Sequence, residues 1–294
     1  MKSGVKRTTP YKVISIIILV ILAILFLFPL YWIVTGAFKP TTDIYASQPV
    51  WWPSEWVTSN FEKLFTKRSA PLFEIGALVG PTVPAAIRWL VNTVFMSVAA
   101  MLLTCITAAM AGYALAKKRF VGRALLFSLI ICAMALPKQV ILIPLLKEMS
   151  ALKLYGSLWA VIFPTVGWPF GVFLMKQFCE GVPGEMLEAA RIDGASEART
   201  FTQIVVPLIK PGIGALAIFT FINSWNDYFM QLVMLPNSAN FTISLGIATL
   251  QGESSVDTGL LMSGAALAAV PIIVVFLIFQ KYFTKGIAMG AVKG

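Results

Sequence analysis

The chain has 294 residues, of which 58% are hydrophobic and only 12% are charged. Because soluble domains carry about 25% charged residues, this composition excludes an ordinary soluble enzyme and indicates a protein that crosses a membrane several times. The net charge of +10 does not require nucleic acid, and we expect no such partner, because cytoplasmic loops of membrane proteins are enriched in Lys and Arg.

The first apolar run predicts an uncleaved membrane span. Lys2, Lys6, Arg7 and Lys12 precede the run, which covers residues 13–38. A secretory signal peptide is the alternative, but its apolar core would have about 7–15 residues. This run is long enough for a full span of about 20 residues, and we expect its basic end in the cytoplasm.

Residues 39–88 form the first long polar region, which we predict to be an extracytoplasmic loop. Its aromatic side chains suit a segment that lies along the membrane interface. Pro71, Pro81 and Pro84 interrupt a weakly apolar piece at residues 70–86. Because prolines break a helix, we expect a short re-entrant or interfacial element there, not a span.

Five further apolar runs complete the prediction of an all-α bundle with six spans. An even number of spans places both termini on one side, and most of the Lys and Arg residues fall on that side. The excess of positive charge predicts that the termini, the tail 284–294 and the loop 181–211 are cytoplasmic. The five runs are residues 89–116, 124–146, 157–178, 212–234 and 260–283.

The loop 181–211 predicts a short helix, a turn and a second helix. Glu185 and Glu188 are expected in the first turn, where the helix dipole favours acids. Gly194 takes the left-handed conformation that ends a helix. Ser196 then caps a second helix to about residue 205, which Pro207 disrupts.

Small side chains give this loop a slim face, which is suited to close approach by a groove on another protein. These side chains are Ala189, Ala190 and Ala195. An ordinary solvated helical loop is the alternative reading of the same residues.

Catalytic and metal-binding motifs are absent from the sequence. The chain has no histidine, which excludes histidine-based metal sites, proton relays and triads. Cys105, Cys132 and Cys179 lie in or beside apolar runs and read as buried small hydrophobes. No phosphate-binding Gly-x-x-x-x-Gly-Lys-Ser/Thr motif occurs. Any energy must therefore come from an ion gradient or from a partner protein.

The loop has the spacing of a known family motif. Glu188-Ala189-Ala190 is followed by three residues, Gly194, nine residues and then Ile204-Val205-Val206-Pro207. This pattern resembles the EAA loop of binding-protein-dependent ABC importer permeases. The one departure is Val206, where leucine is usual.

Other segments resemble the carbohydrate importers of the maltose-permease type within that family. The resemblance covers nearly the whole chain, apart from the proline-interrupted piece at residues 69–86. The matching segments are Asn92-Thr93, Ala111 to Ala116 followed by Lys118-Arg119-Phe120, Trp225-Asn226-Asp227, and the closing Gly290 to Gly294.

The resemblance implies a division of labour among subunits. Such importers pair this chain with a second, related permease subunit and two ATPase subunits that bind ATP and Mg, and an extracytoplasmic sugar-binding protein delivers the carbohydrate. This chain then needs no cofactor and is not itself an enzyme. The implied ATPase-docking positions are Glu188, Ala189, Ala190, Asp193 and Gly194, with Gly290 and Lys293 as contacts of the cytoplasmic tail.

Polar residues in two apolar runs are candidates for the substrate path. A charged residue exposed at the centre of a membrane helix costs about 2.5–3.5 kcal/mol, so these side chains are expected to face the bundle interior, a cavity or the outer interface. A structural polar network is the alternative reading. The candidates are Asn92, Asn223, Asn226 and Asp227.

We therefore predict a permease subunit of a carbohydrate ABC importer, for an oligo- or polysaccharide, in the bacterial cytoplasmic (inner) membrane. A secondary transporter or channel without ATPase partners is the main alternative. It predicts ionisable coupling residues near mid-membrane, for which Asp227 is the best candidate. A membrane-embedded hydrolase lacks nucleophile–base pairs and metal ligands.

Overall fold

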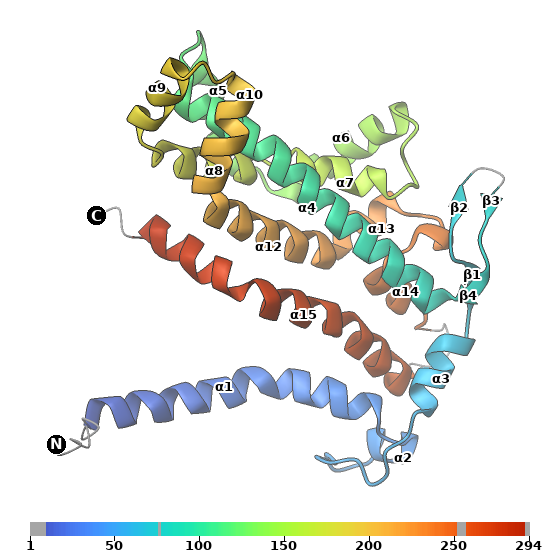
Figure 1. Ribbon diagram of the computed structural model, residues 1–294. Coiled ribbons are helices and arrows are strands. Elements are labelled where there is room, and N and C mark those ends of the chain that lie inside the picture. Colours follow the sequence, from blue (N-terminus) through green and yellow to red (C-terminus); the bar gives the residue numbers. More distant parts are fainter. Residues whose placement is uncertain (1–9, 76–77, 252–256, 292–294) are drawn as a thin grey trace. The chain divides into compact units, whose positions relative to one another are not determined.

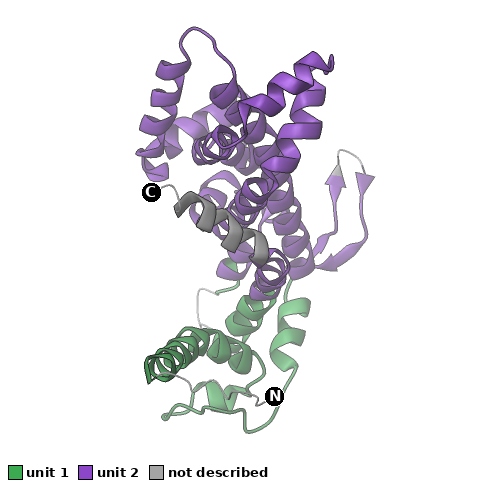
Figure 2. Cartoon of the chain, turned by 60° about the vertical axis from the view of Figure 1, so that its left-hand side comes forward, with its two compact units in different colours: residues 1–68, 249–267 green, residues 69–248, 268–294 purple. Residues whose placement is uncertain are grey.

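The computed structural model describes residues 10–75, 78–251 and 257–291. The chain divides into two compact units (Figure 2). Unit 1 comprises residues 1–68 and 249–267, and unit 2 comprises residues 69–248 and 268–294. The helix α15 (Thr258–Ala291) begins in unit 1 and continues in unit 2.

Unit 1 contains α1 (Pro10–Ala37), α2 (Thr41–Ile44), α3 (Ser59–Thr66) and the start of α15. The side chains of α1 are apolar and mostly exposed, and only the last residues of the helix are buried. Such a helix needs an apolar environment, which agrees with the predicted first span. With 28 residues of high mean hydropathy, α1 is long and apolar enough to cross a membrane.

Buried Asn60 joins the segments of unit 1. Its amide nitrogen donates to the carbonyl oxygens of Ala37 at 3.1 Å and Lys39 at 2.9 Å. In turn, the Ser263 hydroxyl donates to the backbone carbonyl of Asn60 at 3.2 Å. The end of α1, helix α3 and the start of α15 are thus tied by bonds that satisfy buried polar groups.

A β-hairpin lies in the segment 70–86, where a short re-entrant or interfacial element was expected; the position of this segment at the membrane stays a prediction. The strands β1 (Ser69–Pro71) and β4 (Thr82–Pro84) pair antiparallel, with Ala70 opposite Val83. The strands β2 (Glu74–Ile75) and β3 (Leu78–Val79) pair beyond them (Figure 1). The prolines stand at strand ends and in an edge hairpin, where a missing N–H is tolerated. The prediction of an all-α bundle is confirmed, and this short hairpin is the part of the chain that the prediction did not include.

The long helix α4 (Ala85–Lys117) organises unit 2, and it packs most extensively against α8 and α12. Gly112 allows a close approach between α4 and α8, because a Cβ atom at this position would lie 2.7 Å from the backbone of Met175 and Lys176. Unit 2 also contains α5 (Arg123–Met134), α6 (Lys138–Ala151), α7 (Trp159–Val166), α8 (Phe170–Glu180), α9 (Gly184–Ile192), α10 (Glu197–Thr200), α11 (Val206–Leu208), α12 (Lys210–Asn226), α13 (Tyr228–Met234) and α14 (Ile243–Thr249). The last residue of α14 belongs to unit 1. A π-helix η1 (Phe201–Val205) and a 3-10 helix η2 (Ser238–Asn240) lie between these helices.

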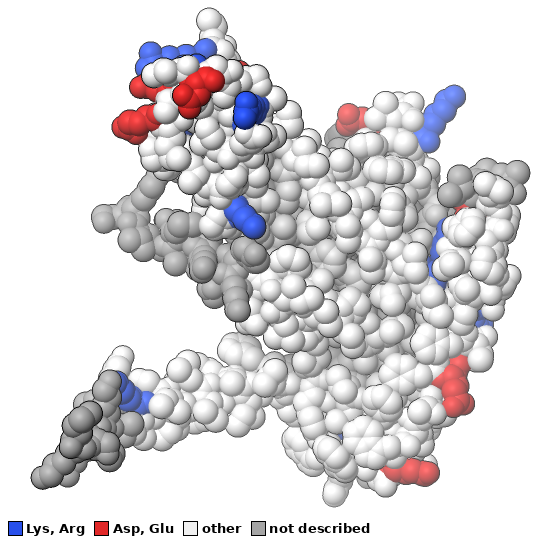
Figure 3. Space-filling view, viewed as in Figure 1, with Lys and Arg blue, Asp and Glu red and all other residues white. Residues whose placement is uncertain are grey.

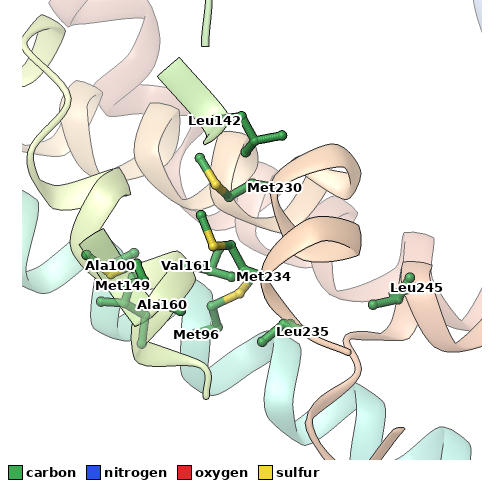
Figure 4. Packing of buried hydrophobic residues seen from close by; sticks show 11 residues of the cluster. Met96, Ala100, Leu142, Met149, Ala160, Val161, Met230, Met234, Leu235 and Leu245 are labelled. Carbon is green, nitrogen blue, oxygen red and sulfur yellow. The ribbon is translucent and has the colours of Figure 1, made fainter. Parts of the chain in front are cut away.

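A methionine-rich core holds the part of unit 2 around α13. Met96 of α4, Met149 of α6 and Met230 and Met234 of α13 are all buried in it (Figure 4). Unbranched methionine side chains fill irregular gaps between helices that cross at uneven angles. The same cluster includes residues of α7 and α14.

The predicted spans agree with the helices in position but not all in shape. The described residues contain four helices long and apolar enough to cross a membrane, or up to six if two bent pairs are counted. The run 124–146 is not straight, because α5 and α6 bend by 108°. Similarly, the segment 197–208 and α12 bend by 77°, and the run 212–234 breaks between α12 and α13.

Candidate functional site: an exposed loop and a membrane cavity

The helix-turn-helix predicted in the loop 181–211 is confirmed (Figure 1). Gly194 has a φ of +72°, which an L side chain rarely adopts. Its N–H donates to the Arg191 carbonyl at 3.0 Å and closes the end of α9. The Ser196 hydroxyl accepts from the N–H of Arg199 at 3.3 Å, as expected of an N-cap. Only Glu185 lies in the first turn of α9; Glu188 lies one turn later, which corrects its predicted place.

Pro207 does not end the second helix in the predicted way. The chain forms a π-helical turn at η1, ahead of Pro207, and then continues through α11 to a bend at Ile209. Because proline lacks an N–H and clashes with the preceding turn, local widening of the helix accommodates it.

The predicted docking residues do not all face outward. Glu188, Ala189, Asp193 and Gly194 are exposed, whereas Ala190 is only 4% exposed. The expected slim face is therefore partly turned inward and packs on this chain. Ile192, which is not among the predicted docking residues, is 87% exposed at the end of α9. An apolar side chain this exposed next to the turn is a further candidate contact.

The loop packs on a buried apolar cluster. A buried cluster contains Val182 just before α9 and Val205 just after α10. Leu187 and Phe201 pack against it from the two helices of the loop, and the Phe201 ring lies 5.4 Å from that of Tyr113 in α4. The loop is thus packed against α4, α8 and α12 through this cluster.

A polar network fixes α10 to the end of α4. Lys118 forms an ion pair with Glu197, and the Tyr113 hydroxyl donates to the same carboxylate at 3.1 Å. Lys117 donates to the carbonyl oxygens of Glu180 and Val182, at 3.2 and 2.6 Å. Figure 3 shows acidic and basic side chains gathered over α9 and α10, whereas most of the neighbouring surface is uncharged.

This network shifts two pKa values. The hydrogen bond from Lys118 is the main cause of the lowered pKa of the Glu197 carboxyl. For Lys118, burial lowers the pKa, but the hydrogen bonds with Glu197 and Tyr113 outweigh it, and the pKa is raised. Both shifts favour the charged pair.

Glu197→Gln is expected to lower the free energy of unfolding by about 1 kcal/mol or less, since the carboxylate is largely exposed. The depressed pKa of Glu197 means that its contribution is present above the ordinary carboxyl pKa and is lost as the pH falls through the lowered value. Thermal unfolding of the purified protein at neutral and acidic pH measures this. The difference from the unsubstituted chain must shrink below about pH 4. A similar loss in the exposed control Glu188→Gln would contradict the prediction.

The Asn92 side chain is buried and hydrogen-bonded to backbone carbonyl oxygens. Its amide nitrogen donates to the carbonyl oxygens of Ala239 and Phe241 at 3.0 and 2.9 Å, and the residue is 5% exposed. Arg88, one turn earlier, donates to Ala239 and to Pro71 at the base of the hairpin. Both side chains hold irregular backbone against α4, as the alternative reading expected, so the prediction that Asn92 lies in the path stays untested.

Asp227 separates α12 from α13 and is paired. Its carboxylate accepts from the Lys138 ammonium at 2.9 Å and caps α13 by accepting from the Met230 N–H at 3.3 Å. Asn223 and Asn226 are exposed, and each amide donates to a carbonyl one turn back in α12. Lys138, which also lies 5.1 Å from the Trp168 ring, was missed as a site residue. A lysine directly after Pro137 within an apolar run was the available signal.

The ion pair borders a cavity of about 580 Å³ in unit 2. This volume lies within the range of small-molecule sites. The lining includes Lys138, Glu148, Trp168 and Asp227, along with many apolar side chains of α5, α6 and α7. The structure thus brings Asp227 to a cavity.

Of the two predicted contact residues of the cytoplasmic tail, the structure describes one. Gly290 lies in the last turns of α15. Lys293 lies outside the described residues. Within the described residues, no group of three or more Cys, Asp or Glu side chains has the arrangement of a metal site.

Comparison with known families assigns residues 107–289 to the family described as the inner membrane component of binding-protein-dependent transport systems. The chain belongs to this family. The matched segment contains both the loop and the lining of the cavity.

Individual relatives extend the match to nearly the whole chain. The arabinooligosaccharides transport system permease protein AraQ of Halalkalibacterium halodurans is 33% identical and covers 93% of each chain. Its namesake in Bacillus subtilis is 32% identical over 97% of this chain and 96% of that protein. A crystal structure of a bacterial ABC transporter that imports the acidic polysaccharide alginate contains a chain of the same fold, with a TM-score of 0.77, 20% identity and coverage of 96% and 99%.

Proposed function

We propose that this chain couples ATP hydrolysis by partner subunits to the import of an oligosaccharide. As a member of the family it is an inner membrane component of a binding-protein-dependent transporter. The permease AraQ, its relative over nearly the full length, belongs to an arabinooligosaccharide system. We therefore assign arabinooligosaccharides as the substrate class to be tested first.

The exposed loop built from α9, the Gly194 turn and α10 carries this proposal. It is rigidly attached to α4 and α8 and offers charged and apolar side chains outward. Glu188, Ala189, Asp193 and Gly194, with the added contact Ile192, form the proposed ATPase-docking surface. Ala190 supports that surface from beneath. The tail residues Gly290 and Lys293 are proposed as further contacts.

Charge supports a cytoplasmic position for this end of unit 2. The basic residues around the loop include Lys117, Lys118, Arg191 and Arg199. Positive charge is enriched in cytoplasmic loops, so we place the loop and both termini in the cytoplasm. The first long loop and the β-hairpin are then extracytoplasmic.

The chain contributes no catalysis in this proposal. ATP and Mg are bound by two ATPase subunits, a second permease subunit completes the membrane part, and an extracytoplasmic binding protein delivers the sugar. We propose that the path runs past Asn223, Asn226 and Asp227, with Asn92 holding the wall beside it. The pairing of Asp227 with Lys138 weakens the alternative of an ion-coupled transporter, which requires a carboxylate free to exchange its ion.

Reconstitution in proteoliposomes tests this function. We expect arabinotriose uptake and sugar-stimulated ATP hydrolysis only when the second permease, the ATPases and the binding protein are all present. Omitting the ATPases is the control. Uptake by this chain alone along an ion gradient would establish the alternative instead.

A further inference from the structure

Three helix breaks of unit 2 meet at the cavity beside Lys138. The bend between α5 and α6 contributes Leu136 and Lys138, and the break between α7 and α8 contributes Trp168. The break between α12 and α13 contributes Asp227. Irregular backbone at membrane depth is tolerated where it lines a cavity, and discontinuous helices typically form the substrate sites of transporters.

A second, smaller cavity of about 70 Å³ adjoins the first. The two share Lys138, Thr165 and Trp168 in their linings. The small cavity is also lined by Thr104 and Asn223. Thr104 is 3% exposed, and its hydroxyl has no hydrogen-bond partner within the described part of the chain. This oxygen is closed off from solvent, so Thr104 belongs to the wall of the small cavity and is not itself a position for a ligand contact.

The position of Thr104 locates the smaller cavity along α4. It lies near the middle of α4, which is long enough to cross a membrane. In secondary transporters, substrate sites lie near the bilayer midplane. The smaller cavity therefore lies beside the middle of α4, and the larger one extends from it to Glu148, Leu152 and Leu154.

Building on the proposed function, we propose that the joined cavities form a subsite for a neutral saccharide unit, contacted by Lys138, Asp227 and Trp168. The Lys138 ammonium has three N–H donors, and its contact with Asp227 leaves donors for sugar hydroxyls. Asp227 offers further carboxylate lone pairs as acceptors. The Trp168 ring supplies an apolar face beside them.

The charges of the lining determine the class of sugar. Lys138 is neutralised by Asp227, and Glu148 adds a second carboxylate to the larger cavity. The ionisable lining groups of that cavity thus have an excess of negative charge. A sugar that carries a carboxylate meets like-charge repulsion there, which solvent weakens because Glu148 is exposed. The subsite therefore favours neutral sugars over uronic acids.

Calorimetric titration of the assembled importer, purified without its binding protein, tests this subsite. Arabinotriose is the neutral probe, and trigalacturonic acid is the acidic probe. We expect arabinotriose to bind the unsubstituted complex more tightly than the acid. Lys138→Gln and Asp227→Asn should each weaken arabinotriose binding by about tenfold or more, the loss expected for a hydrogen bond to a charged group.

Lys147→Gln is the matched control, because Lys147 is on the same helix α6 and does not line either cavity. Asp227→Asn should also raise the affinity for trigalacturonic acid relative to arabinotriose, an effect that loss of structure alone does not produce. Unchanged arabinotriose affinity in both cavity variants, or equal binding of the two probes by the unsubstituted complex, would overturn the subsite.

These measurements distinguish failure of the subsite from failure of the proposed function. A complex that shows binding-protein-dependent ATP hydrolysis but no arabinotriose binding overturns the subsite alone. A complex in which arabinotriose and the binding protein do not stimulate ATP hydrolysis contradicts the proposed function and the subsite together. Size-exclusion chromatography of each variant confirms that the complex is assembled before titration.

Discussion

Gly194→Val is expected to reduce ATP-driven uptake by about tenfold or more while the importer still assembles. The φ of +72° at Gly194 is strained for any L side chain and most of all for a β-branched one, at about 1–3 kcal/mol. Nothing lies within 4 Å of a Cβ atom placed there, so the added Cβ atom meets no neighbouring group. Its effect is to change the turn and so the direction of α9 relative to α10.

The measurement compares arabinotriose uptake with ATP hydrolysis in proteoliposomes. Gly122→Val is the control, because Gly122 has a φ of +84° and equally open surroundings but lies outside the docking loop. We expect uptake to fall more than ATP hydrolysis for Gly194→Val only. Normal uptake in that variant would contradict the docking role, and equal loss in the two variants would attribute the effect to general backbone strain.

Gly112→Val is expected to prevent α4 and α8 from packing together. The new Cβ atom would lie 2.7 Å from backbone atoms of Met175 and Lys176, and backbone cannot move aside as a flexible side chain does. Overpacking of a well-packed interface costs typically 1–3 kcal/mol and more where backbone is displaced. We expect a loss of about 3 kcal/mol or more in stability.

The yield of monodisperse protein in detergent and its unfolding temperature measure this loss. Ala111→Val introduces the same β-branched residue at the neighbouring, half-buried position of α4 and is the matched control. Gly112→Ala should fall between the two variants, because it adds the clashing atom but no branches. The prediction is wrong if Gly112→Val and Ala111→Val unfold at the same temperature.

The helix-turn-helix of the loop could be predicted from the sequence, because the residues that determine it act locally. Gly194 and Ser196 impose a turn and a cap through their own backbone and side-chain chemistry, and both were confirmed. The inward position of Ala190 was not predictable in the same way, because alanine suits a buried position as well as a close contact. Which side of α9 faces the bundle depends on Leu187 and Phe201 meeting the distant cluster around Tyr113.

The cavity was predicted only in part for a related reason. Asp227 was recognisable as a polar residue in an apolar run. Its partner Lys138 lies far away in the sequence and is brought near by the bend between α5 and α6. The β-hairpin was missed because its strands are too short for an alternating pattern to be distinguished.

The single helix α4 contacts the β-hairpin at one end and the loop of α9 and α10 at the other. Near its start, Arg88 and Asn92 hold the hairpin and the segment around Ala239. At its end, Lys117 and Lys118 hold the turn before α9 and the first residue of α10. A straight helix of 33 residues is about 50 Å long, so a small tilt at one end produces a displacement of several ångströms at the other. A force on the loop formed by α9 and α10 would therefore reach the hairpin through α4 without local unfolding.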